Sequence, residues 1–350
     1  VSPLFFTFDN KKLYVSSNLG RNTSAIFVFD PEKAAHEELV FEHPEVDVYA
    51  LFRSKKRKVI TGTGYTTDRF RYHFFDEERA TLQKELESRL PGYEVTVTSM
   101  NKEEDKVLLH AGSDRTQGAY YFFDMKTKDF RKLADLSPWL PEERLAPMKP
   151  VQYTARDGLT IHGYLTLPAG SDGKNLPVVI NPHGGPWARD SWGYDSEVQF
   201  LANRGLAVLQ MNFRSSTGYG RAFWEAGFKQ WGRAMQDDIT DGVQWLIEQG
   251  IADPERIGIY GGSYGGYAVL AGLAFTPDLY ACGVDYVGVS NIFTLLETIP
   301  PYWELGRQML YEQIGHPEKD RDLLKAASPV FHADNIRAPL FVAQGANDPR

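Results

Sequence analysis

The serine of the run Gly261-Gly262-Ser263-Tyr264-Gly265-Gly266 is the residue of this sequence best placed to act as a nucleophile. The run follows an apolar stretch, 256–260, that predicts a buried strand, and it opens a stretch that predicts a helix. A serine on so tight a strand-to-helix turn is held with its hydroxyl group exposed above the sheet edge. The residues two before and two after it have no room for a Cβ atom, and Gly261 and Gly265 meet that requirement. The sequence therefore favours acyl transfer through Ser263 over a plain glycine-rich turn.

Asp348 is the carboxylate best placed to complete such a site. Acyl transfer by serine requires a general base, a carboxylate that orients the base, and donors for the oxyanion. In α/β-hydrolases the carboxylate follows the serine along the chain, at the end of a later strand. The apolar run 340–344 leads into Gly345-Ala346-Asn347-Asp348, and Asp348 lies 85 residues after Ser263. An aspartate between asparagine and proline also commonly caps a loop, so a loop-capping role is the alternative.

A glycine-rich loop earlier in the chain predicts the oxyanion hole. His183-Gly184-Gly185-Pro186 follows the strand predicted at 178–180, where the fold requires a loop of this type. Glycines let a backbone N–H group approach a substrate oxygen without a side chain in the way. We therefore expect the N–H groups of Gly185 and Tyr264 to form the oxyanion hole, and a plain turn at 183–186 is the weaker alternative.

The general base is the part of the site that the sequence does not supply. It should follow the acid, but all eight histidines precede Asp348: His36, His43, His73, His110, His162, His183, His316 and His332. We expect His332 to be structural or at the surface, and His183 to order the oxyanion loop. The expected base is a histidine after Arg350. Residues 1–350 are then an internal fragment of a longer enzyme, with activity near background because losing the base costs several orders of magnitude.

Strands and helices alternate through the second part of the chain. The pattern predicts a hairpin at 151–168, strands at 178–180, 207–213, 257–260, 281–288 and 340–344, and helices at 195–203, 233–249 and 264–275. Strands that are almost entirely apolar are typical of parallel sheets covered on both faces. The predicted fold class is an α/β-hydrolase, a mainly parallel sheet with helices on both faces. Residues 141–350 are its predicted catalytic domain, without its C-terminal end.

The first 140 residues repeat. Three β-rich units each end in a Phe-Asp pair, at positions 30, 76 and 124, so the spacings are 46 and 48 residues. Units of about 40–50 residues with roughly four strands are typical of β-propeller blades, although aromatic strands can also repeat by chance. We predict that residues 1–140 are the last three blades of a propeller whose other blades precede them. Glu77 and Glu78 follow the second pair and predict a solvated turn rather than an acidic pocket.

The composition limits the classes of partner and cofactor. The chain has 350 residues, a formal net charge of −8 and one cysteine, Cys282. This charge gives no reason to expect nucleic acid or an anionic membrane, and no apolar run is long enough to span a bilayer. One cysteine excludes an internal disulfide and a cysteine-based metal cluster, and we expect Cys282 to be buried. No metal and no cofactor are expected, while the oligomeric state and the compartment stay open.

Four ordered motifs resemble the prolyl oligopeptidase family of serine peptidases, with the acylaminoacyl-peptidase and bacterial dipeptidyl-aminopeptidase branch nearest. The motifs are the runs 181–186, 212–220, 261–267 and 345–348. Members of the family carry a seven-bladed propeller before the hydrolase domain, which is similar to the order of repeats and alternating elements here. One departure is Ser215, because the family usually has glycine after the arginine, and we expect it to alter a loop and not the chemistry.

The resemblance implies a serine peptidase that cleaves short peptides through an acyl-enzyme on Ser263, with the propeller excluding folded proteins. Dipeptidyl, acylaminoacyl and oligopeptide specificity all stay open, because the residues that decide among them cannot be placed in the sequence. An esterase or other small-acyl hydrolase would use the same catalytic parts. A non-enzymatic propeller that binds partner proteins is a third alternative, and the intact serine and acid motifs argue against it.

Overall fold

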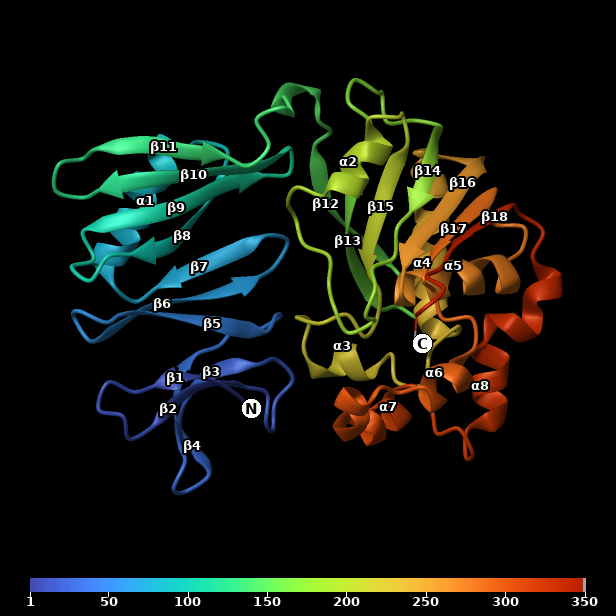
Figure 1. Ribbon diagram of the computed structural model, residues 1–350, viewed down its shortest axis with the longest axis horizontal. Coiled ribbons are helices and arrows are strands. Elements are labelled where there is room, and N and C mark those ends of the chain that lie inside the picture. The colour runs from blue at the N-terminus through green and yellow to red at the C-terminus, as the bar shows by residue number, and fades with distance from the viewer. Residues whose placement is uncertain (349–350) are drawn as a thin grey trace. The chain divides into compact units, whose positions relative to one another are not determined.

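The computed structural model describes residues 1–348, and the chain folds into two compact units (Figure 1). The first unit comprises Val1–Leu145 with two short segments, Ser191–Ser196 and Gly218–Arg221. The second comprises Ala146–Asp190, Glu197–Thr217 and the described residues from Ala222 onward. The assignment of residues 1–140 to propeller blades and of residues 141–350 to a catalytic domain stays a prediction. In residues 1–348 no helix is both long and apolar enough to cross a bilayer.

The first unit contains three antiparallel sheets, one for each predicted repeat. The first sheet consists of β1 (Ser2–Phe6), β2 (Leu13–Ser17), β3 (Ala25–Asp30) and β4 (Ala35–Phe41). The second consists of β5 (Val48–Ser54), β6 (Val59–Thr66) and β7 (Phe70–Phe74). The third consists of β8 (Glu94–Met100), β9 (Lys106–Ser113), β10 (Thr116–Asp124) and β11 (Phe130–Asp135). Each sheet pairs its strands in chain order, as propeller blades do, and the described residues do not form a closed ring.

The repeated Phe-Asp pairs share one local role. The carboxylate of Asp30 accepts hydrogen bonds from the backbone N–H groups two and three residues ahead, at 2.9 and 3.2 Å. Asp124 accepts the same pair of bonds at 2.9 and 3.0 Å. Asp76 accepts a hydrogen bond from the backbone N–H of Arg79 at 2.9 Å. The repeat therefore marks a carboxylate that binds backbone N–H groups where the chain leaves each hairpin.

Glu77 and Glu78 are exposed to solvent as predicted, but the prediction that they form a turn is wrong. These residues begin helix α1 (Glu77–Arg89), which follows β7 where the other two sheets have a fourth strand. Asp76 is the N-cap, and two glutamates in the first turn are favourable beside the positive end of the helix dipole. An aspartate that closes a turn and one that caps a helix accept the same backbone hydrogen bonds, so the local pattern alone does not separate the two.

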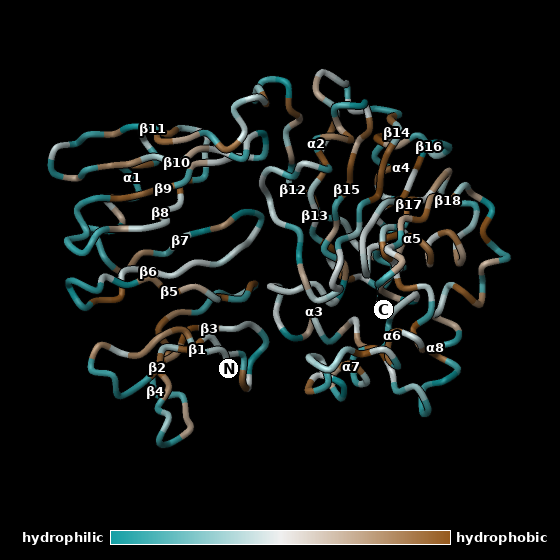
Figure 2. The backbone as a smooth tube through the Cα atoms, viewed as in Figure 1, coloured by the Kyte–Doolittle hydropathy of each residue, from teal (hydrophilic) through white to brown (hydrophobic). Residues whose placement is uncertain are grey.

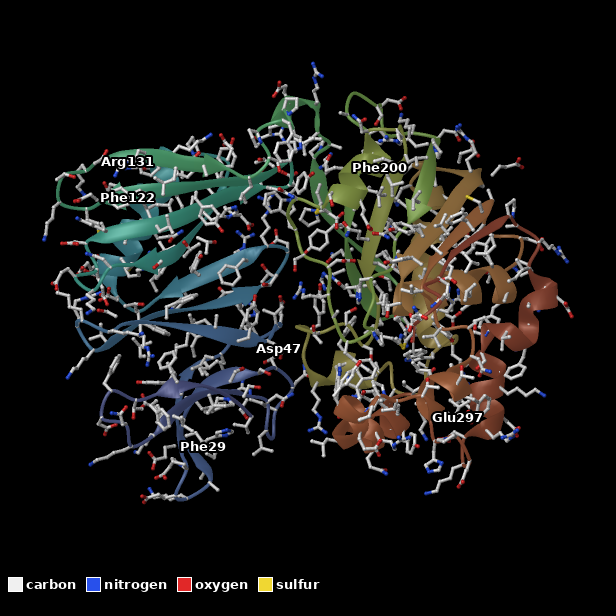
Figure 3. All side chains as sticks on the ribbon, in the orientation of Figure 1. Phe29, Asp47, Phe122, Arg131, Phe200 and Glu297 are labelled. Carbon is white, nitrogen blue, oxygen red and sulfur yellow. The ribbon has the colours of Figure 1, made fainter. Side chains whose placement is uncertain are left out.

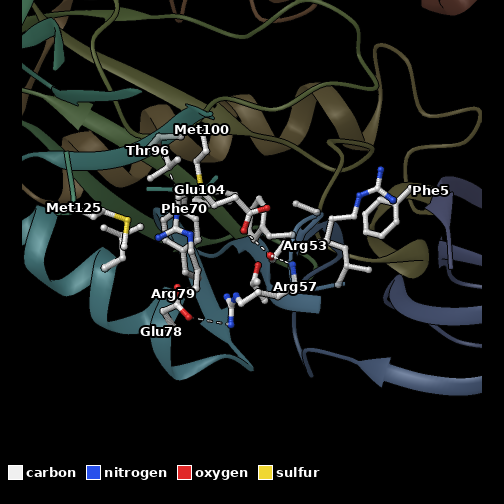
Figure 4. A pocket seen from close by; sticks show the side chains of 18 residues that line it. Phe5, Arg53, Arg57, Phe70, Glu78, Arg79, Thr96, Met100, Glu104 and Met125 are labelled. Carbon is white, nitrogen blue, oxygen red and sulfur yellow. Dashed lines mark hydrogen bonds and ion pairs between the residues drawn. The ribbon is translucent and has the colours of Figure 1, made fainter. Parts of the chain in front are cut away.

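A cavity of about 600 Å³ lies in the first unit against β5, β7, β8 and the start of α1 (Figure 4). Aromatic and aliphatic side chains line it together with the guanidinium groups of Arg53, Arg57 and Arg79. Arg57 lies 2.7 Å from the carboxylate of Asp76. The cavity contains none of the predicted site residues, so its size does not make it the candidate active site.

The second unit is built on a seven-stranded sheet with the order β12-β13-β15-β14-β16-β17-β18. The strands are β12 (Met148–Thr154), β13 (Thr160–Thr166), β14 (Leu176–Ile180), β15 (Ala207–Asn212), β16 (Ala252–Gly262), β17 (Cys282–Tyr286) and β18 (Leu340–Ala343). The five strands from β15 to β18 in this order pair in parallel, and only β12 and β13 join antiparallel. The carboxyl ends of β14, β16, β17 and β18 therefore meet at one edge of the sheet, the usual place for a ligand in such folds.

Helices connect the parallel strands. They are α2 (Ser196–Ala202), α3 (Arg221–Glu225), α4 (Ala234–Glu248), α5 (Tyr264–Phe275), α6 (Ile292–Glu297), α7 (Arg307–Gln313) and α8 (Arg321–Ala327), with 3₁₀ helices at Glu142–Arg144, Pro301–Gly306 and Pro329–Asn335. Helices α4 and α5 agree with two of the predicted helices to within a residue, and they contact β16 and each other. The strands of this sheet carry hydrophobic stretches (Figure 2), and every residue of β15 is buried. Side chains fill the space between the sheet and the helices (Figure 3). Glu297, at the end of α6, is exposed to solvent.

The prediction that Cys282 is buried is wrong, because its side chain is exposed. Successive residues of a strand point to opposite faces. On β17, Gly283 and Asp285 are buried, and a Cβ atom at Gly283 would lie 2.6 Å from a side chain of α5. Cys282 and Tyr286 point to the other face and are exposed. An apolar run on its own does not show that both faces of a strand are covered.

A buried ion pair joins the loop after β15 to helix α4. The backbone N–H and the Nε of Arg214 donate to one carboxylate oxygen of Asp238 at 2.8 and 2.9 Å, and Nη2 donates to the other at 2.7 Å. Nη1 lies 2.8 Å from the carboxylate of Asp157. These hydrogen bonds raise the pKa of Arg214, whereas burial raises the pKa of Asp238 and the guanidinium opposes that shift. The pair fixes the loop at 213–217 on the body of the unit.

We expect Arg214→Gln to lower the free energy of unfolding by about 3–5 kcal/mol, because it leaves the Asp238 carboxylate buried without its cation. Arg337→Gln is the matched control, since the side chains of its pair with Asp278 are 69% and 78% exposed and such pairs contribute little. Urea denaturation of both variants measures the difference. Equal losses in the two variants would contradict a special role for the buried pair.

Candidate active site

Ser263 stands between β16 and α5 in a strained backbone conformation. Its φ is +59° and its ψ is −116°, a region that residues with a Cβ rarely adopt. A Cβ atom at Gly261 would lie 2.6 Å from the backbone of Gly265, and one at Gly265 would lie 2.2 Å from the carbonyl oxygen of Pro182. The predicted need for glycine two residues before and after the serine is confirmed. The Ser263 side chain is exposed, while the next residue, Tyr264, is buried.

The loop after β14 is held by its histidine. The two ring nitrogens of His183 are within hydrogen-bond distance of the Gly184 carbonyl oxygen, at 2.7 Å, and of the Ser216 hydroxyl, at 2.9 Å. The ring also stacks on Phe213 with centroids 4.4 Å apart. Burial lowers the pKa of His183 to about 4, so the imidazole is neutral at pH 7. These contacts fit the predicted ordering role of His183 and leave neither nitrogen for Ser263.

The glycines of this loop lie beside Ser263. A Cβ atom at Gly184 would be 3.5 Å from the Cβ of Ser263. Gly185 has a φ of +127° and precedes a cis peptide bond to Pro186. A side chain at Gly185 would lie 2.7 Å from the backbone nitrogen of Trp187, so glycine is required there for space as well as for conformation.

Asp348 lies in the turn that follows β18. Its backbone N–H donates to the carbonyl oxygen of Gly345 at 3.1 Å, and its carboxylate accepts a hydrogen bond from the Gln344 side chain at 3.2 Å. A pocket of about 460 Å³ brings Asp348 together with Gly185, Ser263 and Tyr264 in its lining. All four residues predicted from the sequence to form the site therefore line one pocket.

The described part of this pocket lining contains no histidine. His332 packs edge-to-face on Phe275, with ring centroids 5.2 Å apart. Phe275 ends α5, twelve residues after Ser263, and twelve helical residues span about 18 Å. His332 is therefore far from the nucleophile, as its place in the sequence predicted. Among residues 1–348 no cluster of three or more His, Cys, Asp or Glu side chains is arranged to hold a metal ion.

Several residues of the pocket were not predicted from the sequence. Asp285 contributes a carboxylate that is only 3% exposed, and burial raises its pKa to about 6. The signal for it was a lone carboxylate in the apolar run 281–289. The apolar walls come from segments that no motif marked: Trp187, Trp231, Leu295, Leu296, Ile299 and Trp303.

Ser215 occupies a position that favours glycine. Its φ is +79°, in the left-handed region, and its hydroxyl donates to the Trp224 carbonyl oxygen at 2.9 Å. The side chain thus points at helix α3, and it does not line the pocket beside Ser263.

A serine on a tight turn after a central parallel strand, with a glycine-rich loop on the neighbouring strand, defines an α/β-hydrolase. Residues 192–350 match the sequence profile of the prolyl oligopeptidase family. Dipeptidyl aminopeptidase BIII of Pseudoxanthomonas mexicana is 41% identical over 100% of this chain and 52% of that protein. Dipeptidyl peptidase family member 6 of Caenorhabditis elegans is 31% identical over 99% of this chain and 50% of that protein. The chain belongs to the prolyl oligopeptidase family and spans about half the length of these relatives.

Solved structures share the fold. A puromycin-hydrolyzing peptidase of Mycobacterium tuberculosis matches with a TM-score of 0.80 at 25% identity, over 100% of this chain and 54% of that chain. A puromycin hydrolase matches with a TM-score of 0.79 at 23% identity, over 98% of this chain and 52% of that chain. The matched residues include both units of the chain.

Gly265→Ala should disturb the elbow, because the new methyl group would collide with the backbone oxygen of Pro182. We expect a loss of about 1–3 kcal/mol in the free energy of unfolding, as for other overpacked sites. Gly262→Ala is the matched control, since its Cβ would meet no atom closer than 3.2 Å, a ring carbon of Tyr286. Urea denaturation compares the two, and a control that loses as much as Gly265→Ala would refute the steric argument.

The buried His183 should make the protein sensitive to acid. Its pKa is about 4 in the folded state and 6.5 in the unfolded state, so the unfolded state binds more protons between these values. The free energy of unfolding should therefore fall as the pH drops from 6.5 toward 4. His183→Asn does not titrate, so the stability advantage of the wild type over this variant should shrink on acidification. Urea titrations at several pH values test this, and an advantage that stays constant would contradict the burial of a neutral ring.

Proposed function

We propose that this protein is a serine peptidase that cleaves short peptides through an acyl-enzyme on Ser263. Asp348 is the proposed acid of the catalytic triad, and the backbone N–H groups of Gly185 and Tyr264 are the proposed oxyanion donors. The observation that supports this most is the single pocket that all four residues line. In the same proposal residues 1–140 are propeller blades that precede the catalytic domain.

The proposed reaction follows the general serine-hydrolase scheme. The Ser263 oxygen forms a bond to the carbonyl carbon of the scissile peptide while its proton passes to the base, and the two N–H groups donate to the new oxyanion. The base then returns the proton to the leaving amine as the C–N bond breaks. Water adds to the acyl-enzyme with the same proton transfers, which releases the peptide acid and restores Ser263.

The proposed base is a histidine outside residues 1–350. Both histidines weighed for this role are engaged elsewhere, because His183 binds within its own loop and His332 packs at the far end of α5. We infer that the polypeptide 1–350 by itself hydrolyses peptides at a rate near background.

The proposed substrates are peptides with a free amino terminus from which dipeptides are released. Two relatives are named as a dipeptidyl aminopeptidase and a dipeptidyl peptidase family member, and they match over nearly the whole chain. Tryptophan, leucine and isoleucine side chains line the pocket beside Ser263, which suits an apolar side chain next to the scissile bond. Acylaminoacyl and longer peptides are the competing substrates within the same proposal.

Covalent labelling with a fluorophosphonate tests the proposal on the whole gene product and on residues 1–350. We expect rapid labelling of the whole product, none after Ser263→Ala, and unchanged labelling after Ser171→Ala in an exposed loop. Residues 1–350 should label slowly or not at all, because the base is missing. Labelling that survives Ser263→Ala would refute the assignment of the nucleophile.

Chromogenic substrates then separate the alternatives on the whole product. Turnover of dipeptidyl substrates above that of acylaminoacyl substrates and short acyl esters supports the proposed specificity. Preference for the esters would make the protein an esterase. Absence of both labelling and turnover would leave a binding module as the better interpretation.

A further inference from the structure

Asp285 lies where the nucleophile elbow meets the strand that leads to Asp348. It is buried on β17, one residue before the strand ends, and it lines the pocket beside Ser263. Tyr286, the next residue, accepts a hydrogen bond from the Ser263 backbone N–H at 2.9 Å. Val287 then donates its N–H to the carbonyl oxygen of Ala343, the last residue of β18, also at 2.9 Å. Tyr286 and Val287, the two residues that follow Asp285, thus connect the elbow to the strand that leads to Asp348.

The carboxylate of Asp285 fills the gap between these two parts. Its Oδ1 accepts a hydrogen bond from the backbone N–H of Gly288 at 2.9 Å. A Cβ atom at Gly288 would lie 2.2 Å from this oxygen, and one at Gly266 would lie 2.4 Å from it. Gly266 belongs to the first turn of α5, three residues after Ser263. The same oxygen therefore touches the elbow helix on one side and the turn after β17 on the other.

The turn that Asp285 closes is strained. Val287 has a φ of +49°, which is costly for a β-branched residue. The hydrogen bond from Gly288 to Asp285 spans this residue and holds it in place. If the bond is lost, the turn can relax, and both backbone contacts that it makes would move.

The hydrogen bond from Gly288 requires an acceptor oxygen at Asp285 but not a negative charge. Within residues 1–348 no cation is found to shift its pKa, and burial raises that pKa to about 6. A carboxamide of the same shape would accept the hydrogen bond from Gly288 without the cost of a buried charge. Shape and the acceptor oxygen are therefore the properties that the site uses.

We propose that Asp285 is a positioning residue, whose side chain wedges the first turn of α5 against the 286–288 turn and so fixes Ser263 relative to Asp348. The proposal rests on the proposed function, because it concerns how that site is held. Asp285 does not touch the reacting atoms in this scheme, and its effect passes through the backbone at Gly266 and Tyr286.

The test measures the rate of Ser263 labelling by a fluorophosphonate, with kcat and KM for a chromogenic dipeptide, on the whole gene product. We expect Asp285→Ala to slow labelling and kcat about 10- to 100-fold, because small displacements of reacting groups have effects of that size, with KM nearly unchanged. Asp285→Asn should restore both rates to within about 3-fold of wild type, since it keeps the acceptor oxygen. Asp334→Ala, an exposed aspartate of the same unit, is the matched control and should leave the rates unchanged.

Several outcomes would overturn the proposal. If the Asp285→Ala variant is labelled at the wild-type rate but has a lower melting temperature, the role of Asp285 is only structural. Asp285→Asn that is as slow as Asp285→Ala would mean that the charge, not the shape, is required. If Asp285→Ala does not fold, Asp285→Glu replaces it, because the extra methylene presses the carboxylate into Gly266 and Gly288. Glu is then expected to be at least about 10-fold slower than Asn, and equal rates would refute the wedge.

Failure of the proposed function is distinguishable from failure of this inference. If the wild-type protein is neither labelled nor active, the serine peptidase assignment is wrong. If the wild type is labelled and the three variants label at its rate, only the positioning role of Asp285 is wrong.

Discussion

The close approach of three backbone segments at Ser263 is the constraint on which the rest of the second unit depends. Strand β16, the first turn of α5 and the loop after β14 meet with no side chain between them, because Gly261 and Gly265 provide only backbone. This contact forces Ser263 into its left-handed conformation and exposes the hydroxyl at the sheet edge. It also brings the glycine loop to the nucleophile. In the sheet β15 lies between β13 and β14, so β14 is the direct neighbour of β16. This order places the loop after β14 next to the turn at Ser263.

The loop after β15 supports the glycine loop, although it contains no predicted site residue. The hydroxyl of Ser216 and the ring of Phe213 hold the His183 imidazole from two sides. Arg214, between them in sequence, is fixed by its buried pair with Asp238 of α4. Helix α4 thus holds the loop after β15 through the ion pair, this loop holds the His183 imidazole, and the imidazole contacts the backbone at Gly184. This gives a physical reason for part of the second of the four motifs, because its Phe213, Arg214 and Ser216 side chains contact other segments of the same unit.

The sequence predicted the parts of the structure that local chemistry decides. The tight turn at Ser263, helices α4 and α5 and the alternation of strands and helices in the second unit follow from glycine positions and hydrophobic periodicity, and they lie where expected. The errors arose where tertiary contacts decide. An aspartate such as Asp76 accepts the same backbone hydrogen bonds in a turn as at a helix start. Cys282 lies on the exposed face of its strand, and the sequence alone does not show which face of that strand is covered. Asp285 was missed for a related reason, because its partners Gly266 and Gly288 are brought to it by the fold.

Two carboxylates line the candidate pocket, and their surroundings suit them to different tasks. Asp348 is partly exposed on a turn, where its carboxylate accepts an amide hydrogen bond from Gln344. Asp285 is enclosed by glycines, bonded to a backbone N–H and raised in pKa by burial. A carboxylate that orients an imidazole must be accessible to it from the pocket. Asp348 lies on a partly exposed turn and Asp285 is enclosed, so environment rather than residue type separates the proposed acid from the proposed wedge.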